Sequence, residues 1–292
     1  MCASQKGRLP RPRTAGGHGG LDVTQPSQSE QQTLFHEAMA TTFTVQVVHP
    51  DARYARHAVG AAFAELDLLE RQLSRFVEGS DVWRINRLRP GETAVVSLPT
   101  FRCLEEALQL QRQTAGAFDI TYASTSGSDP ARRLGLTPTG CMVQKLAEGV
   151  QIDLGGIGKG FALDCMASVL DEWDILSARL SASTSTHLAL DAPPNQQGWT
   201  VGFGPEPQPV ALRREALAAS GVGVRGQHIV DPRSHQPTRH LRAWARAARG
   251  ARADALSTAF LVMTHSERER YCRHWHVEGA IQDAPTRNHN PG

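Results

Sequence analysis

The stretch Asp153-Leu154-Gly155-Gly156-Ile157-Gly158-Lys159-Gly160 joins a short apolar run to a predicted helix, and it decides how the rest of the chain is interpreted. Glycine lets a backbone turn sharply, and the first turn of a helix exposes N–H groups that favour anions. The stretch therefore predicts a loop that holds phosphate groups, with Asp153 and Lys159 as additional polar groups. It is neither a Walker loop, which needs Gly at position 153 and Ser or Thr after Lys159, nor a G-x-G-x-x-G fingerprint. A purely structural turn is the alternative interpretation.

Helices and strands are intermixed on both sides of this loop. Hydrophobic periodicity predicts helices over residues 55–76, 100–114, 157–170 and 254–264, a short turn or helix over 81–86, and strands over 42–48, 178–183, 199–203 and 228–230. Residues 142–154 suggest two short strands, and residues 121–140, rich in Thr, Ser, Gly and Pro, suggest a loop. Because no strict βαβ rhythm is present, the pattern favours the α+β class over a doubly wound sheet.

The composition is ordinary for a globular protein, with 292 residues, 40% hydrophobic and 21% charged residues, and a net charge of +2. No broad basic patch is visible and no segment is long enough to span a bilayer, so we expect no nucleic-acid partner and no membrane span. Five scattered cysteines without a C-x-x-C pair favour a reducing compartment and, with no signal peptide visible, a cytoplasmic location. The expected organisation is a disordered leader over residues 1–30, one domain over 31–283 and a disordered tail over 284–292.

Asp254 and Thr258 place a carboxylate and a hydroxyl at i and i+4, on one face of the start of a predicted helix. Hard cations such as Mg²⁺ prefer oxygen ligands and keep substrate phosphates in their coordination shell. The pair could therefore supply two oxygens to a phosphate-bound metal. The alternative is that Asp254 only caps the helix while Thr258 packs.

Two histidine-containing segments also carry possible chemistry. His228, Asp231 and Arg233 surround a predicted strand end, where His228 could act as a general base or hold a phosphate, or could lie in a surface turn. Cys272, His274 and His276 alternate, so a strand would place all three on one face as possible zinc ligands. That second segment supports an unrelated metal-binding or partner-binding module as a further hypothesis.

Taken in order, six motifs resemble the ApbE family of FAD-dependent protein FMN transferases. They are Met39-Ala40-Thr41-Thr42-Phe43, Leu73-Ser74-Arg75-Phe76 with residues 80–86, Gly116-Ala117-Phe118-Asp119-Ile120-Thr121, the 153–160 loop, His228-Ile229-Val230-Asp231-Pro232-Arg233, and Ala253-Asp254-Ala255-Leu256-Ser257-Thr258-Ala259. The resemblance implies an ApbE-like, T-fold-related α+β fold of mixed sheets with packed helices. It also implies an Mg²⁺-dependent enzyme that moves FMN from FAD to a Thr or Ser hydroxyl of an acceptor protein.

The resemblance further implies a role for each matching residue. The residues expected to bind FAD are Met39, Phe76, Ala117, Phe118, Asp119, Asp153, Lys159 and Ile229. The backbone of Gly156, together with Asp254 and Thr258, is expected to bind Mg²⁺ at the FAD pyrophosphate. His228 is expected to be the catalytic histidine near the reacting phosphate.

The chain departs from the family pattern where an Asn-Ala-Gly-Gly-Asp run is usual and residues 181–186 read Ser-Ala-Ser-Thr-Ser-Thr. Ala40 and the pair Ser234-His235 also replace the family's usual Gly and Thr-Gly. Because Gly pairs permit backbone conformations that Ser and Thr do not adopt freely, an alternative remains open. In that alternative, the protein binds or hydrolyses FAD but has lost protein flavinylation.

Overall fold

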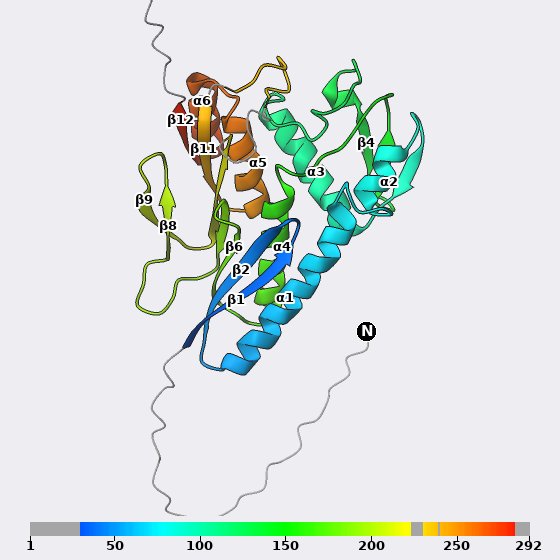
Figure 1. The fold of residues 1–292 in the computed structure, drawn as a ribbon. Coiled ribbons are helices and arrows are strands. Elements are labelled where there is room, and N and C mark those ends of the chain that lie inside the picture. The colour runs from blue at the N-terminus through cyan, green and yellow to red at the C-terminus, as the bar shows by residue number, and fades with distance from the viewer. Residues whose placement is uncertain (1–29, 223–229, 239, 284–292) are drawn as a thin grey trace, which may run out of the picture.

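The computed structural model describes residues 30–222, 230–238 and 240–283 (Figure 1). The expected leader and tail lie almost wholly outside these ranges, so the domain boundaries stay predictions. The strands of the main sheet are β1 (Glu30–Ala38), β2 (Thr41–His49), β6 (Ser177–Ala182), β7 (Thr186–Ala189), β10 (Glu215–Gly221), β11 (His240–Ala247) and β12 (Glu278–Asp283). They pair in the order β1-β2-β6-β7-β10-β11-β12, and every pair is antiparallel.

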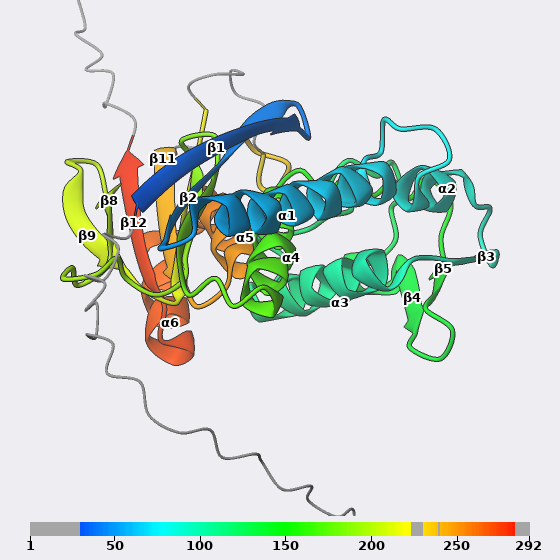
Figure 2. The ribbon, with the colours of Figure 1, turned by 90° about the horizontal axis from the view of Figure 1, so that it is seen from below.

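Helices cover one face of this sheet (Figure 2). The helices are α1 (Ala52–Leu73), α2 (Asp81–Arg87), α3 (Leu98–Gln113), the short 3₁₀ turn η1 (Pro130–Arg132), α4 (Gly158–Glu172), α5 (Gly250–Phe260) and α6 (His265–Trp275). Of these, α1, α4 and α5 pack on the strands, while α3 leads away to a small sheet of β3 (Thr93–Val95), β5 (Met142–Lys145) and β4 (Leu134–Thr137). The α+β prediction is confirmed, and no helix in the described ranges is long and apolar enough to cross a membrane.

Side-chain alternation in β10 and β11 explains how the two faces of the sheet differ. Ala216 and Ala218, with Ala243 and Ala245 on the paired strand, join the main core under the helices. Leu217 and Trp244 point to the other face, because successive strand residues alternate sides, and join a second core with the hairpin of β8 (Trp199–Phe203) and β9 (Gln208–Leu212). The small alanines therefore let α5 lie close to the sheet.

The expected helices at 100–114 and 157–170 and the strands at 42–48, 178–183 and 199–203 are confirmed to within a few residues. The first helix ends at Leu73 rather than Phe76, because Ser74 is already extended. The 121–140 loop contains η1 and β4, so that prediction was only partly right.

The second strand expected within residues 142–154 is absent. The backbone N–H of Ile152 donates to the Asn86 side chain at 2.7 Å, and the N–H of Asp153 donates to the Ile120 carbonyl at 2.8 Å. These groups satisfy the backbone without a partner strand.

The strand prediction for residues 272–276 was wrong, because Cys272 and His274 lie in helix α6, and His276 caps it in a left-handed conformation. Thr264 and Glu267 form a capping box at the start of this helix, a T-x-x-E signal that the sequence does carry. At helical spacing, residues two apart point in different directions, so the alternation does not gather the three side chains on one face.

Candidate functional site

The glycine loop folds into a tight turn that delivers the chain into α4. The N–H groups of Ile157 and Gly158 donate to the Leu154 carbonyl, at 3.0 and 2.7 Å, and Asp153 Oδ1 accepts from the N–H of Gly155 at 2.8 Å. No side chain within the loop caps the helix. The N–H groups at this helix start that the loop does not satisfy can take partners from elsewhere in the chain.

One of these partners is Asp254, which lies in the second turn of α5 and is 2% exposed. Its Oδ2 accepts from the N–H of Gly160 at 3.0 Å, although the two residues are 94 positions apart. The interpretation of Asp254 as a cap of its own helix is therefore not what the structure shows. That cap comes from Asp164 on α4, whose carboxylate accepts from the N–H groups of Gly250 and Ala251 at 2.7 and 3.0 Å.

The two helices thus cap each other, and this is possible because they cross at Gly160 and Gly250. A Cβ at either position would overlap the backbone of the other. Burial raises the pKa of the Asp164 carboxyl above its usual range, while the two N–H donors oppose that rise. Asp164 therefore serves the helix crossing, and Asp254 is the carboxylate directed toward the glycine loop.

Lys159 provides the cation beside Asp254. Its Nζ lies 3.5 Å from Oδ1 and 3.4 Å from Oδ2, and the hydroxyl of Thr186 donates to Oδ1 at 3.3 Å. The Lys159 side chain is 28% exposed, against 3% for that of Asp254. Lys159 can therefore reach an anionic group at the surface, while Asp254 stays fixed below it.

The residues expected to bind Mg²⁺ lie together. Thr258 follows Asp254 by one helical turn, and a Cβ built on Gly156 would lie 3.3 Å from Thr258 Oγ1 and 3.2 Å from Cε2 of Phe118. A side chain at this position would require Thr258 and Phe118 to shift by a few tenths of an ångström, so glycine eases the close approach of the loop backbone to α5.

The donor set tests whether a metal fits here. A buried carboxylate, a hydroxyl and a backbone carbonyl make an all-oxygen set, which is the chemistry that Mg²⁺ prefers. The Asp254 carboxylate already pairs with one cation, the Lys159 ammonium, so it lies where a positive charge is stabilised. The described residues contain no group of three or more His, Cys, Asp or Glu side chains that could hold a metal, so a metal here would rely on other oxygens, including those of a phosphate ligand.

The segment from Gly116 to Asp119 lies on the other side of the glycine loop. Ala117 and Phe118 are buried, and Phe118 faces Gly156. Asp119 is also buried, and its carboxylate accepts from Gln111 and Thr121 at 2.7 Å and pairs with Arg133 at 3.3 Å. The Asp119 carboxylate oxygens therefore hold the conformation of this segment through hydrogen bonds and an ion pair.

A cavity of about 480 Å³ opens beside this segment. Gly116 and Asp119 line it together with Arg133, Arg233 and residues of α3 and η1. The guanidinium groups of these two arginines already pair with carboxylates, Arg133 with Asp119 and Arg233 with Asp231 and Glu267.

Asp153 is held by Tyr122 and by Arg75, to neither of which the sequence motifs assign a role. Tyr122 donates its hydroxyl to Oδ2 at 3.3 Å, and Nε of Arg75 lies 3.5 Å from the same oxygen. Arg75 also lies over the ring of Phe76, which is 82% exposed. Burial raises the pKa of the Tyr122 phenol, and the neighbouring Asp153 raises it further, so Tyr122 stays a donor at neutral pH.

We expect Tyr122→Phe to weaken FAD binding by about three- to tenfold, because Asp153 loses one hydrogen bond to a charged group. Flavin-fluorescence titration measures this change. Tyr54→Phe is the matched control, because its hydroxyl donates to the Trp173 carbonyl, away from Asp153. Equal FAD affinity in wild type and Tyr122→Phe would contradict a positioning role.

Met39 and Ala40 form the two-residue turn between β1 and β2, both with positive φ, of 50° and 55°. Such a turn usually takes Asn or Gly, because a side chain strains the left-handed conformation. The N–H of Met39 donates to Glu70 Oε1 of α1 at 2.8 Å and so helps to hold the turn. Strained backbone of this kind is found at functional sites. The positive φ of Ala40 also explains why the family usually has Gly at this position, because Gly adopts such a φ without strain.

His228 and Ile229 lie outside the described residues, so their expected roles stay predictions. Described residues that precede and follow them in the sequence, Ser220 and Arg233, contact residues of the candidate site. Ser220 Oγ lies 3.1 Å from Thr258 Oγ1, and Gly116 packs against the Arg233 side chain.

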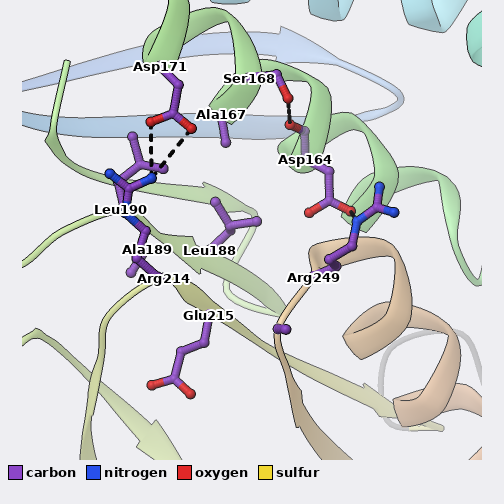
Figure 3. A pocket seen from close by; sticks show the side chains of 11 residues that line it. Asp164, Ala167, Ser168, Asp171, Leu188, Ala189, Leu190, Arg214, Glu215 and Arg249 are labelled. Atoms are coloured by element: carbon purple, nitrogen blue, oxygen red, sulfur yellow. Dashed lines mark hydrogen bonds and ion pairs between the residues drawn. The ribbon is translucent and has the colours of Figure 1, made fainter. Parts of the chain in front are cut away.

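A second hollow, of about 300 Å³, lies between α4 and the start of α5 (Figure 3). Its charged groups already have partners: Arg214 pairs with Asp171 at 3.1 Å, and Arg249 with Asp164 at 3.5 Å. We therefore assign it no ligand.

The model of the ApbE family matches residues 39–281 of this chain. An FAD:protein FMN transferase of Vibrio cholerae is 23% identical over 283 residues, which cover 80% of this chain and 82% of that protein. One of Salmonella typhimurium is 24% identical and covers 82% of this chain and 81% of its own. The solved apo structure of Pseudomonas stutzeri flavinyl transferase ApbE superposes with a TM-score of 0.75 at 23% identity, covering 86% of this chain and 92% of that one.

Proposed function

The chain belongs to the ApbE family, and on that premise we propose that it is an Mg²⁺-dependent FAD:protein FMN transferase acting on a Thr or Ser hydroxyl of a partner protein. The observation that carries the proposal is the cluster of Gly156, Lys159, Asp254 and Thr258 at the glycine loop. It combines a cation and an all-oxygen metal-ligand set, which together suit a pyrophosphate.

Each residue has a separate task in this proposal. Asp254, Thr258 and the Gly156 carbonyl would hold Mg²⁺, which when bound supplies positive charge to the FAD pyrophosphate. Lys159 would turn from Asp254 toward a phosphate oxygen. Asp153 would hold FAD in the orientation that Arg75 and Tyr122 fix, and the exposed ring of Phe76 would lie against an aromatic part of FAD.

The transfer step forms one P–O bond to the acceptor and breaks one P–O bond of the FAD pyrophosphate. The acceptor hydroxyl attacks the FMN phosphorus, the bridging P–O bond breaks, and AMP leaves with the bridging oxygen. His228 would take the hydroxyl proton as general base. Positive charge around the pyrophosphate stabilises the charge that develops on the leaving phosphate.

We expect FMN to become covalently attached when the protein is incubated with FAD, Mg²⁺ and a candidate acceptor, and attachment to stop when EDTA replaces Mg²⁺. Intact-mass spectrometry of the acceptor measures the added FMN, and chromatography measures the AMP released. An acceptor with its Thr or Ser changed to Ala is the control. Equal attachment with Mg²⁺ and with EDTA would contradict the metal-dependent mechanism.

One observation favours the alternative of an FAD-hydrolysing relative. Ser183, in the turn between β6 and β7 where the family usually has a Gly pair, has a left-handed φ of 55°. The next strand brings Thr186 to Asp254, so strain in this turn lies close to the proposed metal site. In this alternative, FMN and AMP appear free in solution and the acceptor mass is unchanged.

A cytoplasmic location stays a proposal as well. The four cysteines in the described ranges, Cys103, Cys141, Cys165 and Cys272, are free thiols, which supports a reducing compartment.

A further inference from the structure

Three hydroxyl groups from two elements form a line at the proposed metal site. Thr258 Oγ1 lies 3.1 Å from Ser220 Oγ, and Ser220 Oγ lies 2.8 Å from Ser257 Oγ. Ser257 in turn donates to the backbone carbonyl of Asp254 at 2.8 Å. Thr258 and Ser257 belong to α5, whereas Ser220 reaches them from β10.

When all three hydrogen bonds of this line form together, the carbonyl at its end sets their direction. A carbonyl oxygen only accepts, so the Ser257 hydroxyl gives its one proton to Asp254. Ser257 can then only accept from Ser220, and Ser220, having given its proton to Ser257, can only accept from Thr258. The Thr258 proton therefore points to Ser220.

This direction matters for a cation. A neutral hydroxyl binds a metal through an oxygen lone pair, so its proton must point to another acceptor. The other acceptor recorded for the Thr258 hydroxyl in the described part of the chain is the Asp254 carbonyl, which lies farther away, at 3.4 Å, and also accepts from Ser257. Ser220 thus supplies the nearer position for the proton and leaves the Thr258 lone pairs free.

We propose that Ser220 is a positioning residue that takes the proton of Thr258 and so prepares the Thr258 oxygen to bind a hard divalent cation. The inference rests on the proposed function, because it assumes that Thr258 is a metal ligand. It adds a residue that acts on the metal only through Thr258. Outer partners of this kind typically change metal affinity by about 10- to 100-fold when they are removed.

The fold itself does not call for a hydroxyl at this position. Ala218 precedes Ser220 by two residues on the same face of β10 and packs under α5 with a methyl group alone. Ser220→Ala should therefore fold normally.

The test is a titration of the FAD-loaded protein with Mn²⁺, in which electron paramagnetic resonance measures the free metal. We expect Ser220→Ala to bind Mn²⁺ about tenfold more weakly, and Ser220→Thr, which keeps the hydroxyl, to stay near wild type. Ser168→Ala is the matched control, because that hydroxyl on α4 donates only to the Asp164 carbonyl. Thermal unfolding in EDTA should be the same for wild type and both Ser220 variants.

Unchanged Mn²⁺ affinity in Ser220→Ala would overturn the proposal, and so would an equal loss in Ser220→Thr. Failure of the wild-type protein to bind Mn²⁺ would overturn the metal site and the metal dependence of the proposed function. The two failures are distinguishable, because only the second affects the unchanged chain.

Discussion

Asp254→Asn is expected to lower FMN transfer by about 100-fold or more and to remove the Mg²⁺ dependence of FAD binding. Several kcal/mol of charge stabilisation by a metal corresponds to a loss of this size. Asn keeps an oxygen that can accept from the Gly160 N–H, so the contact between α4 and α5 can survive. Lys159 loses its ion pair, but its side chain is 28% exposed and can turn to water.

Flavin-fluorescence titration with Mg²⁺ and with EDTA measures the effect of Asp254→Asn on binding, and intact-mass spectrometry measures transfer. A variant that melts at a lower temperature but keeps the Mg²⁺-dependent FAD affinity of wild type would contradict the assignment of Asp254 as a metal ligand. His228→Ala is the comparison variant. It should keep metal-dependent FAD binding and lose only transfer, because a general base acts in the chemical step.

The second large effect is expected at the helix crossing. Gly160→Ala should destabilise the protein by about 3 kcal/mol or more, which lowers the melting temperature of a chain of this size by about 10 °C. The reason is that the new methyl group would overlap the carbonyl oxygen of Gly250. Moving the helices apart would also stretch the hydrogen bond from the Gly160 N–H to Asp254.

Gly158→Ala is the matched control for this substitution, two residues earlier in the same helix. A Cβ there meets nothing nearer than Leu154 Cβ, at 3.9 Å. Because the new methyl group meets no backbone there, this variant should be about as stable as wild type. Thermal unfolding followed by circular dichroism checks both variants, and similar melting temperatures for the two would contradict the crossing argument.

Local elements could be predicted because their signals lie within a few residues. In the α1 region, apolar side chains recur at helical spacing, and those of Val59, Leu66 and Leu73 are buried as that spacing requires. The β-branched residues of 42–48 likewise predicted β2. The order of the motifs was also enough to place the chain in its family.

The strands β10 and β11 were not predicted, because their Ala-rich sequences carry little strand signal and alanine by itself favours helix. Only the tertiary structure explains them. The methyl groups of Ala218 and Ala245 lie beneath α5, where small side chains let the helix approach the sheet. Leu217 and Trp244 lie on the opposite face and pack with the β8–β9 hairpin.

The chemistry at the site divides in the same way. The sequence by itself determined which groups are available: a glycine loop, Lys159, and an Asp254–Thr258 pair one helical turn apart. Only the tertiary structure decided their partners, because the crossing of α4 and α5 brings the Gly160 N–H to Asp254 across 94 residues, and the sheet brings Thr186 and Ser220 to the same place. Spacing along a helix is set by the chain itself, whereas contacts between distant segments depend on how closely their small residues let them pack.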